Sequence, residues 1–218
     1  MKKVFIAFLC FSGFFGARSQ NLIPNPSFED TVQCPDNAGQ ISYATPWYSP
    51  TAGTPDYFNS CGPTLVSVPL NVWGYQYART GNAYAEIMVY TNGSSDREYL
   101  QVQLIDTLIN GKLYCVEFFV SQCGISSFSS HTPIAITEIG LLFSSNSIIS
   151  GTFSILPYTP QIVSPVGVYL NDTTLWMKIF GLYTATGNER YITIGNFKND
   201  TSTDTITCLL YTSDAADE

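Results

Sequence analysis

The chain has 218 residues, and its net charge of −8 makes it acidic. This charge excludes a nucleic-acid-binding protein, whose affinity rests on basic contacts to phosphate, and it disfavours anionic membrane surfaces. Charged residues make up only 12% of the chain, whereas tyrosine and phenylalanine each occur 14 times. Such a composition is typical of β-structure with aromatic surfaces, and the length suits a single all-β domain.

The first 19 residues have the three parts of a secretory signal peptide. Two lysines supply the positive start, residues 4–15 the apolar stretch, and residues 17–19 a small-x-small cleavage site before Gln20. The alternative is a membrane anchor, which needs about 20 apolar residues and therefore a longer stretch than this one. We expect an exported protein, at the outer membrane, the cell surface or in the medium, with no transmembrane segment.

Seven segments after the leader have strand character between Gly, Pro, Asn and Ser residues. They cover residues 41–43, 83–90, 99–103, 113–121, 134–144, 176–184 and 191–196. In residues 83–90 the alternation places Ala83, Ala85, Ile87 and Val89 on one face. In residues 113–121 the expected core face consists of Tyr114, Val116, Phe118 and Val120.

Two long segments, 31–71 and 145–174, are rich in proline and are expected to be irregular. Long ordered loops of this kind often carry function. No stretch has a helical period over three turns. Many short strands without helices predict a β-sandwich or barrel, with residues 20–207 as one domain.

Of the six cysteines, Cys34 and Cys61 flank the first irregular segment, and we expect them to form a disulfide, which an exported protein can keep. Cys115 and Cys123 lie on one expected strand and can pair only if that strand ends before Cys123 and the chain turns back. No C-x-x-C motif or His/Cys cluster indicates a zinc site.

The last eleven residues, 208–218, differ from the rest of the chain. They are similar to the translation of a transposon-end adapter used to prepare sequencing libraries. The alternative is a natural polar tail. If the similarity holds, the natural reading frame was cut near Thr207, and Cys208 is not a native cysteine.

Several motifs occur in the order found in galactose-binding-like jelly rolls, which include many carbohydrate-binding modules. They are the opening strand at residues 21–29, a G-x-x-x-x-x-x-G-x-x-Y strand at 74–84, paired strands around an L-x-x-G-K-x-Y turn at 99–118, and closing strands at 176–185 and 189–197. The chain most resembles a domain of exported Bacteroidota proteins, including the segment 54–59. In that group the domain precedes an OmpA-like peptidoglycan-binding domain or a type IX secretion sorting domain.

The resemblance implies a jelly-roll β-sandwich whose last strand lies beyond Thr207 and is missing here. Such jelly rolls often hold a structural calcium ion near their first and last strands. Glu29 and Asp30 occupy the matching place, and hard oxygen ligands suit Ca²⁺. The resemblance therefore implies a structural calcium ion in the intact protein, with its other ligands on the missing strand.

Catalysis has weak support in the sequence. A glycosidase needs two carboxylates across a cleft, and the carboxylates on or near expected strands are Glu86, Glu98, Glu117, Glu138 and Glu189. Spacing does not pair them, and strand carboxylates usually lie on solvated faces. The single histidine, His131, lies in a serine-rich loop without a G-x-S-x-G motif. We expect no enzyme.

Sugar binding has more support, because aromatic rings stack on the C–H faces of pyranose rings. Aromatic residues are concentrated in and after the first irregular segment, at Trp47, Tyr48, Tyr57, Phe58, Trp73, Tyr75 and Tyr77. We expect Tyr57, Trp73 and Tyr75 to form a ligand platform and Trp47 to be structural. The alternative is that most of these rings pack in the core.

These observations together predict a non-catalytic cell-surface binding module that recognises a glycan or another surface partner. A second hypothesis is a structural spacer joined to a missing OmpA-like domain. A third is an accessory module of a truncated, secreted glycoside hydrolase. The three hypotheses differ in the kind of domain or signal that they place after Thr207.

Overall fold

In the computed structural model, the described residues are 20–124, 128 and 133–207. Twelve β-strands and two short 3-10 helices form their secondary structure, with no α-helix among them. The all-β class predicted from the sequence is confirmed, and the jelly-roll connectivity stays a prediction. No helix in this part of the chain is long and apolar enough to span a membrane. The expected signal peptide, His131 and the segment 208–218 lie outside the described residues.

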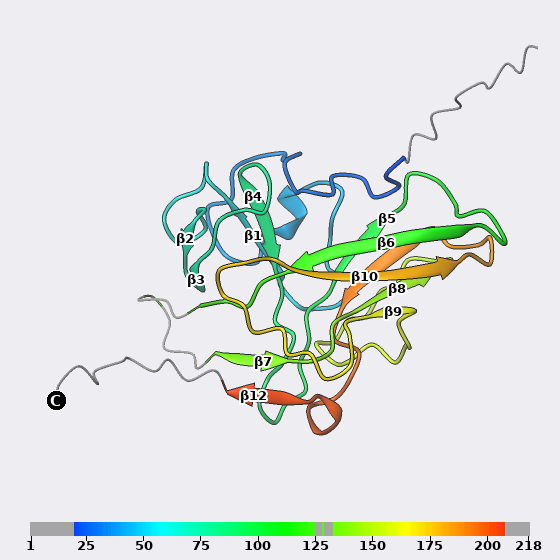
Figure 1. The fold of residues 1–218 in the computed structure, drawn as a ribbon. Helices are drawn as coiled ribbons and strands as arrows, with labels where there is room; N and C mark the ends of the chain where they lie inside the picture. The colour runs from blue at the N-terminus through cyan, green and yellow to red at the C-terminus, as the bar shows by residue number, and fades with distance from the viewer. Residues whose placement is uncertain (1–19, 125–127, 129–132, 208–218) are drawn as a thin grey trace, which may run out of the picture.

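A four-stranded antiparallel sheet forms one layer of the molecule (Figure 1). Its strands lie in the order β5 (Leu100–Gln103), β11 (Tyr191–Gly195), β8 (Gly140–Ser144) and β9 (Ile162–Val163). Tyr48 extends this sheet by an isolated bridge to Gln101 of β5. The segments predicted at 99–103 and 191–196 therefore lie side by side although they are far apart in sequence.

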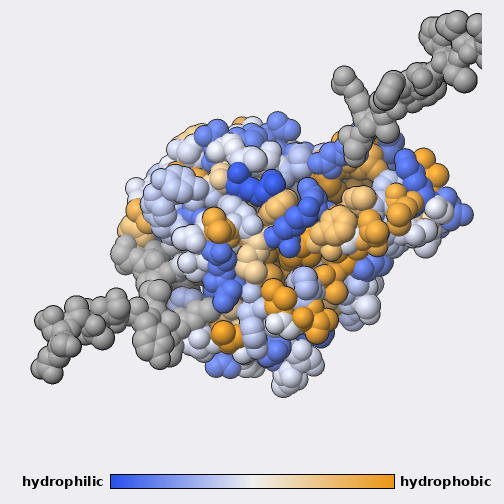
Figure 2. All heavy atoms as spheres, in the orientation of Figure 1, coloured by the Kyte–Doolittle hydropathy of each residue, from blue (hydrophilic) through white to orange (hydrophobic). Residues whose placement is uncertain are grey.

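The strands β6 (Leu113–Val120) and β10 (Met177–Thr184) form an eight-residue antiparallel pair that crosses in front of this sheet (Figure 1). Tyr114, Val116, Phe118 and Val120 pack against the core, as the alternation predicted. The opposite face of the pair is exposed, and hydrophobic side chains gather over β6 and β10 on this side of the molecule (Figure 2).

The core occupies part of the space between the two layers. Val102 of β5, Ile192 of β11 and Ile179 of β10 are fully buried there. Across the layers, the ring of Phe143 in β8 stacks on that of Tyr183 in β10, with centroids 4.4 Å apart. Each fully buried aliphatic side chain contributes about 1.5–3 kcal/mol to folding. The two layers are therefore held face to face as a sandwich.

Three further antiparallel pairs surround the sandwich. They are β1 (Asp56–Asn59) with β4 (Ala83–Glu86), β2 (Leu70–Asn71) with β3 (Gly74–Tyr75), and β7 (Ile134–Ile136) with β12 (Thr205–Thr207). The alternation predicted for residues 83–89 holds, because the side chains assigned to one face all contact the core. The strand itself ends at Glu86, earlier than expected.

Two strand predictions are wrong. Ile41–Tyr43 is a 3-10 helix, η1, because the Ala44 N–H donates to the Ile41 carbonyl and closes a tight turn that buries Ile41. Residues 21–29, the opening strand of the resemblance, form a turn in which the Phe28 N–H donates to the Asn25 carbonyl. The Asn25 amide takes over backbone hydrogen bonds that a neighbouring strand would otherwise supply, by donating to the carbonyls of Asp30 and Thr45.

Two other expected strands are interrupted. The segment 134–144 divides into β7 and β8, because Ser164 inserts between them: the Ile139 N–H donates to its hydroxyl, which donates to the Thr137 carbonyl. Residues 74–84 contain β3 and the start of β4, separated by an irregular segment, residues 76–82. The strand β1 lies in the segment that was expected to be irregular.

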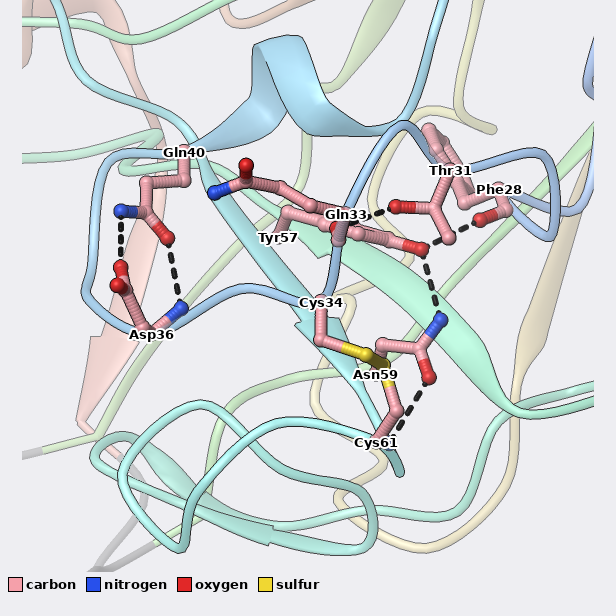
Figure 3. Close-up of a disulfide and its surroundings, with 9 residues drawn as sticks. All are labelled: Phe28, Thr31, Gln33, Cys34, Asp36, Gln40, Tyr57, Asn59 and Cys61. Carbon is pink, nitrogen blue, oxygen red and sulfur yellow. Dashed lines mark hydrogen bonds between the residues drawn. A yellow bond between two sulfur atoms is a disulfide. The ribbon is translucent and has the colours of Figure 1, made fainter.

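The disulfide expected between Cys34 and Cys61 is present, with the two Cα atoms 5.6 Å apart (Figure 3). It ties the irregular segment to the end of β1. Hydrogen bonds also link β1 to the segment around Phe28: the Asn59 amide donates to the Tyr57 hydroxyl, which donates to the Phe28 carbonyl. No disulfide joins Cys115 to Cys123, because β6 runs straight to Val120.

Candidate functional site

A cavity of about 750 Å³ opens between the β4 and β6 sides of the molecule. The strands β5, β8 and β11 provide its apolar floor, and residues 20–28 contribute to another wall. Its lining also includes polar and aromatic residues, among them Trp73, Tyr75, Gln76, Arg79 and Glu86. The cavity therefore combines an apolar interior with a few polar groups, which is the usual composition of a ligand site.

Tyr75, which lines the cavity, forms an exposed aromatic pair with Tyr77. Tyr75 is 53% exposed and Tyr77 is 64% exposed. Their rings meet edge to face with centroids 5.4 Å apart, and the Tyr75 hydroxyl donates to that of Tyr77 over 2.9 Å. Each ring restricts the other, so the pair presents aromatic surface to solvent in a defined arrangement.

Contacts to the β6–β10 pair anchor the segment that carries the tyrosines. The Trp176 indole N–H, just before β10, donates to the Tyr77 carbonyl over 2.9 Å. The Gln76 amide donates to the Ser121 hydroxyl beyond β6. The Trp176 ring also packs against Tyr84 of β4 with centroids 5.6 Å apart. The segment with the aromatic pair is thus anchored to the β6–β10 side, and Trp176 links it to Tyr84 of β4.

The structure separates the three residues expected to form the ligand platform. Tyr57 is fully buried, so its assignment as a binding residue is wrong: β1 lies inside the fold and its ring packs in the core. Trp73 is half-buried, and its indole N–H donates to the Asp56 carboxylate. Of the three, Tyr75 has the most accessible ring. Trp47 is buried, and its N–H donates to the Asn25 carbonyl.

A pair of carboxyl groups lies beside Trp73. Asp56 of β1 and Glu86 of β4 are register partners, and Asp56 also accepts the Gly39 N–H. Burial raises the pKa of the Glu86 carboxyl well above its usual range, and the nearby carboxylates of Asp56 and Glu98 raise it further. The neutral acid is favoured at Glu86, and its hydrogen bond with Asp56 joins the two carboxyl groups across β1 and β4.

Glu98 joins three segments of the backbone. Its carboxylate accepts hydrogen bonds from the N–H groups of Thr54 and Met88. Burial raises the pKa of Glu98, and these two hydrogen bonds oppose that rise. The carboxylate therefore acts as a connector between β4 and the irregular segment before β1.

The remaining candidate carboxylates have structural partners at separate places. Glu117 forms an exposed ion pair with Lys178 across β6 and β10, and Glu138 pairs with Lys198. Glu189 is buried in the turn between β10 and β11. It accepts hydrogen bonds from the Tyr183 hydroxyl, the Thr186 hydroxyl and the N–H groups of residues 186–188.

The proposed calcium ligands have different surroundings. The Glu29 carboxylate accepts the N–H groups of Asn82 and Ala83 and closes the turn before β4. Asp30 is exposed. Within residues 20–124 and 133–207, no group of three or more His, Cys, Asp or Glu side chains is placed to hold a metal ion. The calcium site stays a prediction.

Three residues of this region were missed by sequence reasoning. Trp176 is distant from Tyr77 in the chain, Arg79 belongs to no recognisable motif, and Tyr77 itself was not chosen for the platform. The Arg79 guanidinium lies over the Phe119 ring, 3.4 Å from its centroid. A signal for Tyr75 and Tyr77 existed in their spacing, because residues two apart on an extended chain share a side.

Comparisons with protein-family models, with curated proteins and with solved structures found no match for this chain.

Proposed function

We propose that the chain is an exported, non-catalytic binding module that recognises a glycan at the cell surface or in the medium. The observation that carries this proposal is the Tyr75–Tyr77 pair, two exposed rings in edge-to-face contact, of which Tyr75 lines the cavity. Flat aromatic surface suits the C–H face of a sugar ring, and a fixed ring loses little conformational entropy on binding.

Polar groups beside the pair suit the hydroxyls of a sugar. Gln76 and the neutral carboxyl of Glu86 line the cavity together with Tyr75. A neutral acid and an amide both donate and accept hydrogen bonds, so they match a ligand whose hydroxyls do the same. The net charge of −8 favours a neutral glycan over an acidic one.

The cysteine chemistry supports export. The Cys34–Cys61 disulfide joins two segments of the mature domain, and disulfides persist in oxidising compartments outside the cytosol. The non-catalytic part of the proposal rests on the carboxylates, since Glu98 and Glu189 accept backbone hydrogen bonds that hold the fold together and Glu117 is engaged in an exposed ion pair.

A glycan-binding assay tests the proposal. The protein is applied to an array of immobilised neutral bacterial and plant polysaccharides, and the dissociation constant for any bound glycan is measured for Tyr75→Ala/Tyr77→Ala. Each stacked ring contributes about 0.5–1.5 kcal/mol beyond its burial, so we expect binding to weaken roughly tenfold or more.

The control variant is Tyr158→Ala, which removes another exposed tyrosine, 48% exposed, from a different loop. Its affinity should equal that of the wild-type protein. Retention of no glycan by the wild-type protein would refute the proposal. Equal affinity of the double variant and the wild-type protein would show that the aromatic pair is not the platform.

A further inference from the structure

The two strands that border the cavity each have one neighbour among the described strands. The strand β4 pairs with β1, and β6 pairs with β10. Each therefore has a second edge with no described strand beside it. An exposed strand edge presents a row of backbone N–H and C=O groups, which is a template for another strand.

The lining of the cavity shows that it follows these edges. Side chains alternate between the two faces of a strand, so a cavity against one face touches every second residue. This cavity touches every residue from 83 to 87 on the β4 side and every residue from 114 to 120 on β6. Contact with both faces of each strand places the open space along the two edges.

The side chains that flank the space lack part of their packing. Val116, Phe118 and Val120 of β6 are only half-buried, as are Ile87 and Val89 after β4. Val102, on β5 within the same core, is fully buried. An apolar side chain at every second position of an inserted strand would cover these residues and extend the core.

We propose that the cavity is an acceptor groove for a β-strand of another polypeptide, separate from the glycan platform. The seven residues from 114 to 120 span roughly 20 Å of strand, so the inserted segment has about seven residues. Backbone donors and acceptors along both edges favour a peptide over an acyl chain, which would leave them without partners.

The charge of the chain defines the peptide further. The chain has a net charge of −8, whereas the charged groups at the groove itself, Glu117 and Arg79, are of opposite sign and Glu86 is neutral. An acidic strand would be repelled, so the ligand strand has apolar residues alternating with neutral or basic ones. This binding mode adds main-chain hydrogen bonds for affinity and apolar side chains for selectivity.

Hydrogen exchange measured by mass spectrometry tests the groove. The probe is a nine-residue peptide of alternating valine and lysine with blocked ends. A control peptide has the same sequence with N-methyl groups on alternate backbone amides, which removes the donors on one edge. Dodecanoate serves as the acyl-chain probe. We expect fast exchange of part of the β6 amides in the protein alone and slower exchange only with the unmodified peptide.

Three results would overturn the proposal. Slow exchange throughout β6 in the protein alone would show that the chain itself fills the groove. Equal protection of the β6 amides by the N-methylated peptide would show that the peptide binds through nonspecific apolar or charge contacts and not through strand pairing. Protection by dodecanoate but not by the peptide would identify an acyl-chain pocket.

A matched pair of variants locates the binding. Val116→Thr places a hydroxyl in the groove, and Val163→Thr places the same group on β9, where Val163 is already exposed. We expect about fivefold weaker peptide binding for Val116→Thr and no change for Val163→Thr, with unchanged circular dichroism for both. An equal effect of the two substitutions, or none from Val116→Thr, would contradict the assignment.

Discussion

Glu189 is the carboxylate whose removal has the clearest expected effect on folding. It is 4% exposed and accepts hydrogen bonds from five donors in the turn between β10 and β11. Burial alone would raise the pKa of the Glu189 carboxyl, but the hydrogen bonds from Tyr183, Thr186 and the turn backbone lower it to about 2. The folded state therefore binds the ionised form more strongly than the unfolded state does.

The substitution Glu189→Gln removes this ionised group and turns an amide N–H₂ toward donors that need an acceptor. A pKa near 2, against about 4.3 for an unfolded chain, corresponds to about 3 kcal/mol at neutral pH. Hydrogen bonds to a charged group are worth about 1.5–3 kcal/mol. We expect Glu189→Gln to lower the free energy of unfolding by about 2–3 kcal/mol at pH 7.

The pH dependence gives the sharper test. Because the folded pKa is lowered, the stabilisation is fully present above about pH 4.3 and is lost as the pH falls toward 2. Urea unfolding followed by tryptophan fluorescence at pH 7, 5 and 3 should show the wild-type and Glu189→Gln curves converging at low pH. A difference that is absent at pH 7, or constant across the range, would refute the reasoning. Glu117→Gln, at an exposed ion pair, is the control and should change little.

Three further changes test other parts of the fold by urea unfolding. Replacing Cys34 and Cys61 by alanine should lower the free energy of unfolding by about 3 kcal/mol, because the disulfide no longer restricts the unfolded chain; equal midpoints would contradict this. Trp47→Ala should cost about 3–5 kcal/mol, since a buried ring and its hydrogen bond are lost. Because the pKa of Glu86 is raised in the folded state, the unfolded chain ionises first, and we expect the wild-type protein to lose stability as the pH rises above about 4.3. Glu86→Gln should remove this loss. The same pH profile in the variant and the wild-type protein would count against a buried acid at this position.

The core face of β6 and the contacts of residues 83–89 could be predicted from the sequence, because they depend on a local property. Side chains alternate along any extended chain, so apolar residues at every second position mark the buried face whichever strand lies beside it. The Cys34–Cys61 disulfide could also be predicted, since both residues flank one loop-rich segment. The 3-10 helix at Ile41–Tyr43 could not be predicted, because three residues are too few to show a period, and their turn is set by hydrogen bonds to neighbouring backbone.

At the candidate site, too, local sequence predicts some features and tertiary contacts decide the others. Tyr57 and Tyr75 are both aromatic residues next to turn-forming sequence, yet Tyr57 is buried under Phe28 and the disulfide while Tyr75 faces solvent beside Tyr77. The groove between β4 and β6 joins segments about 30 residues apart. By itself, the sequence determined composition, β-class and the alternation of faces, which are local. Only the tertiary structure decided which faces meet and which edges stay open, because burial and pairing depend on residues distant in the chain.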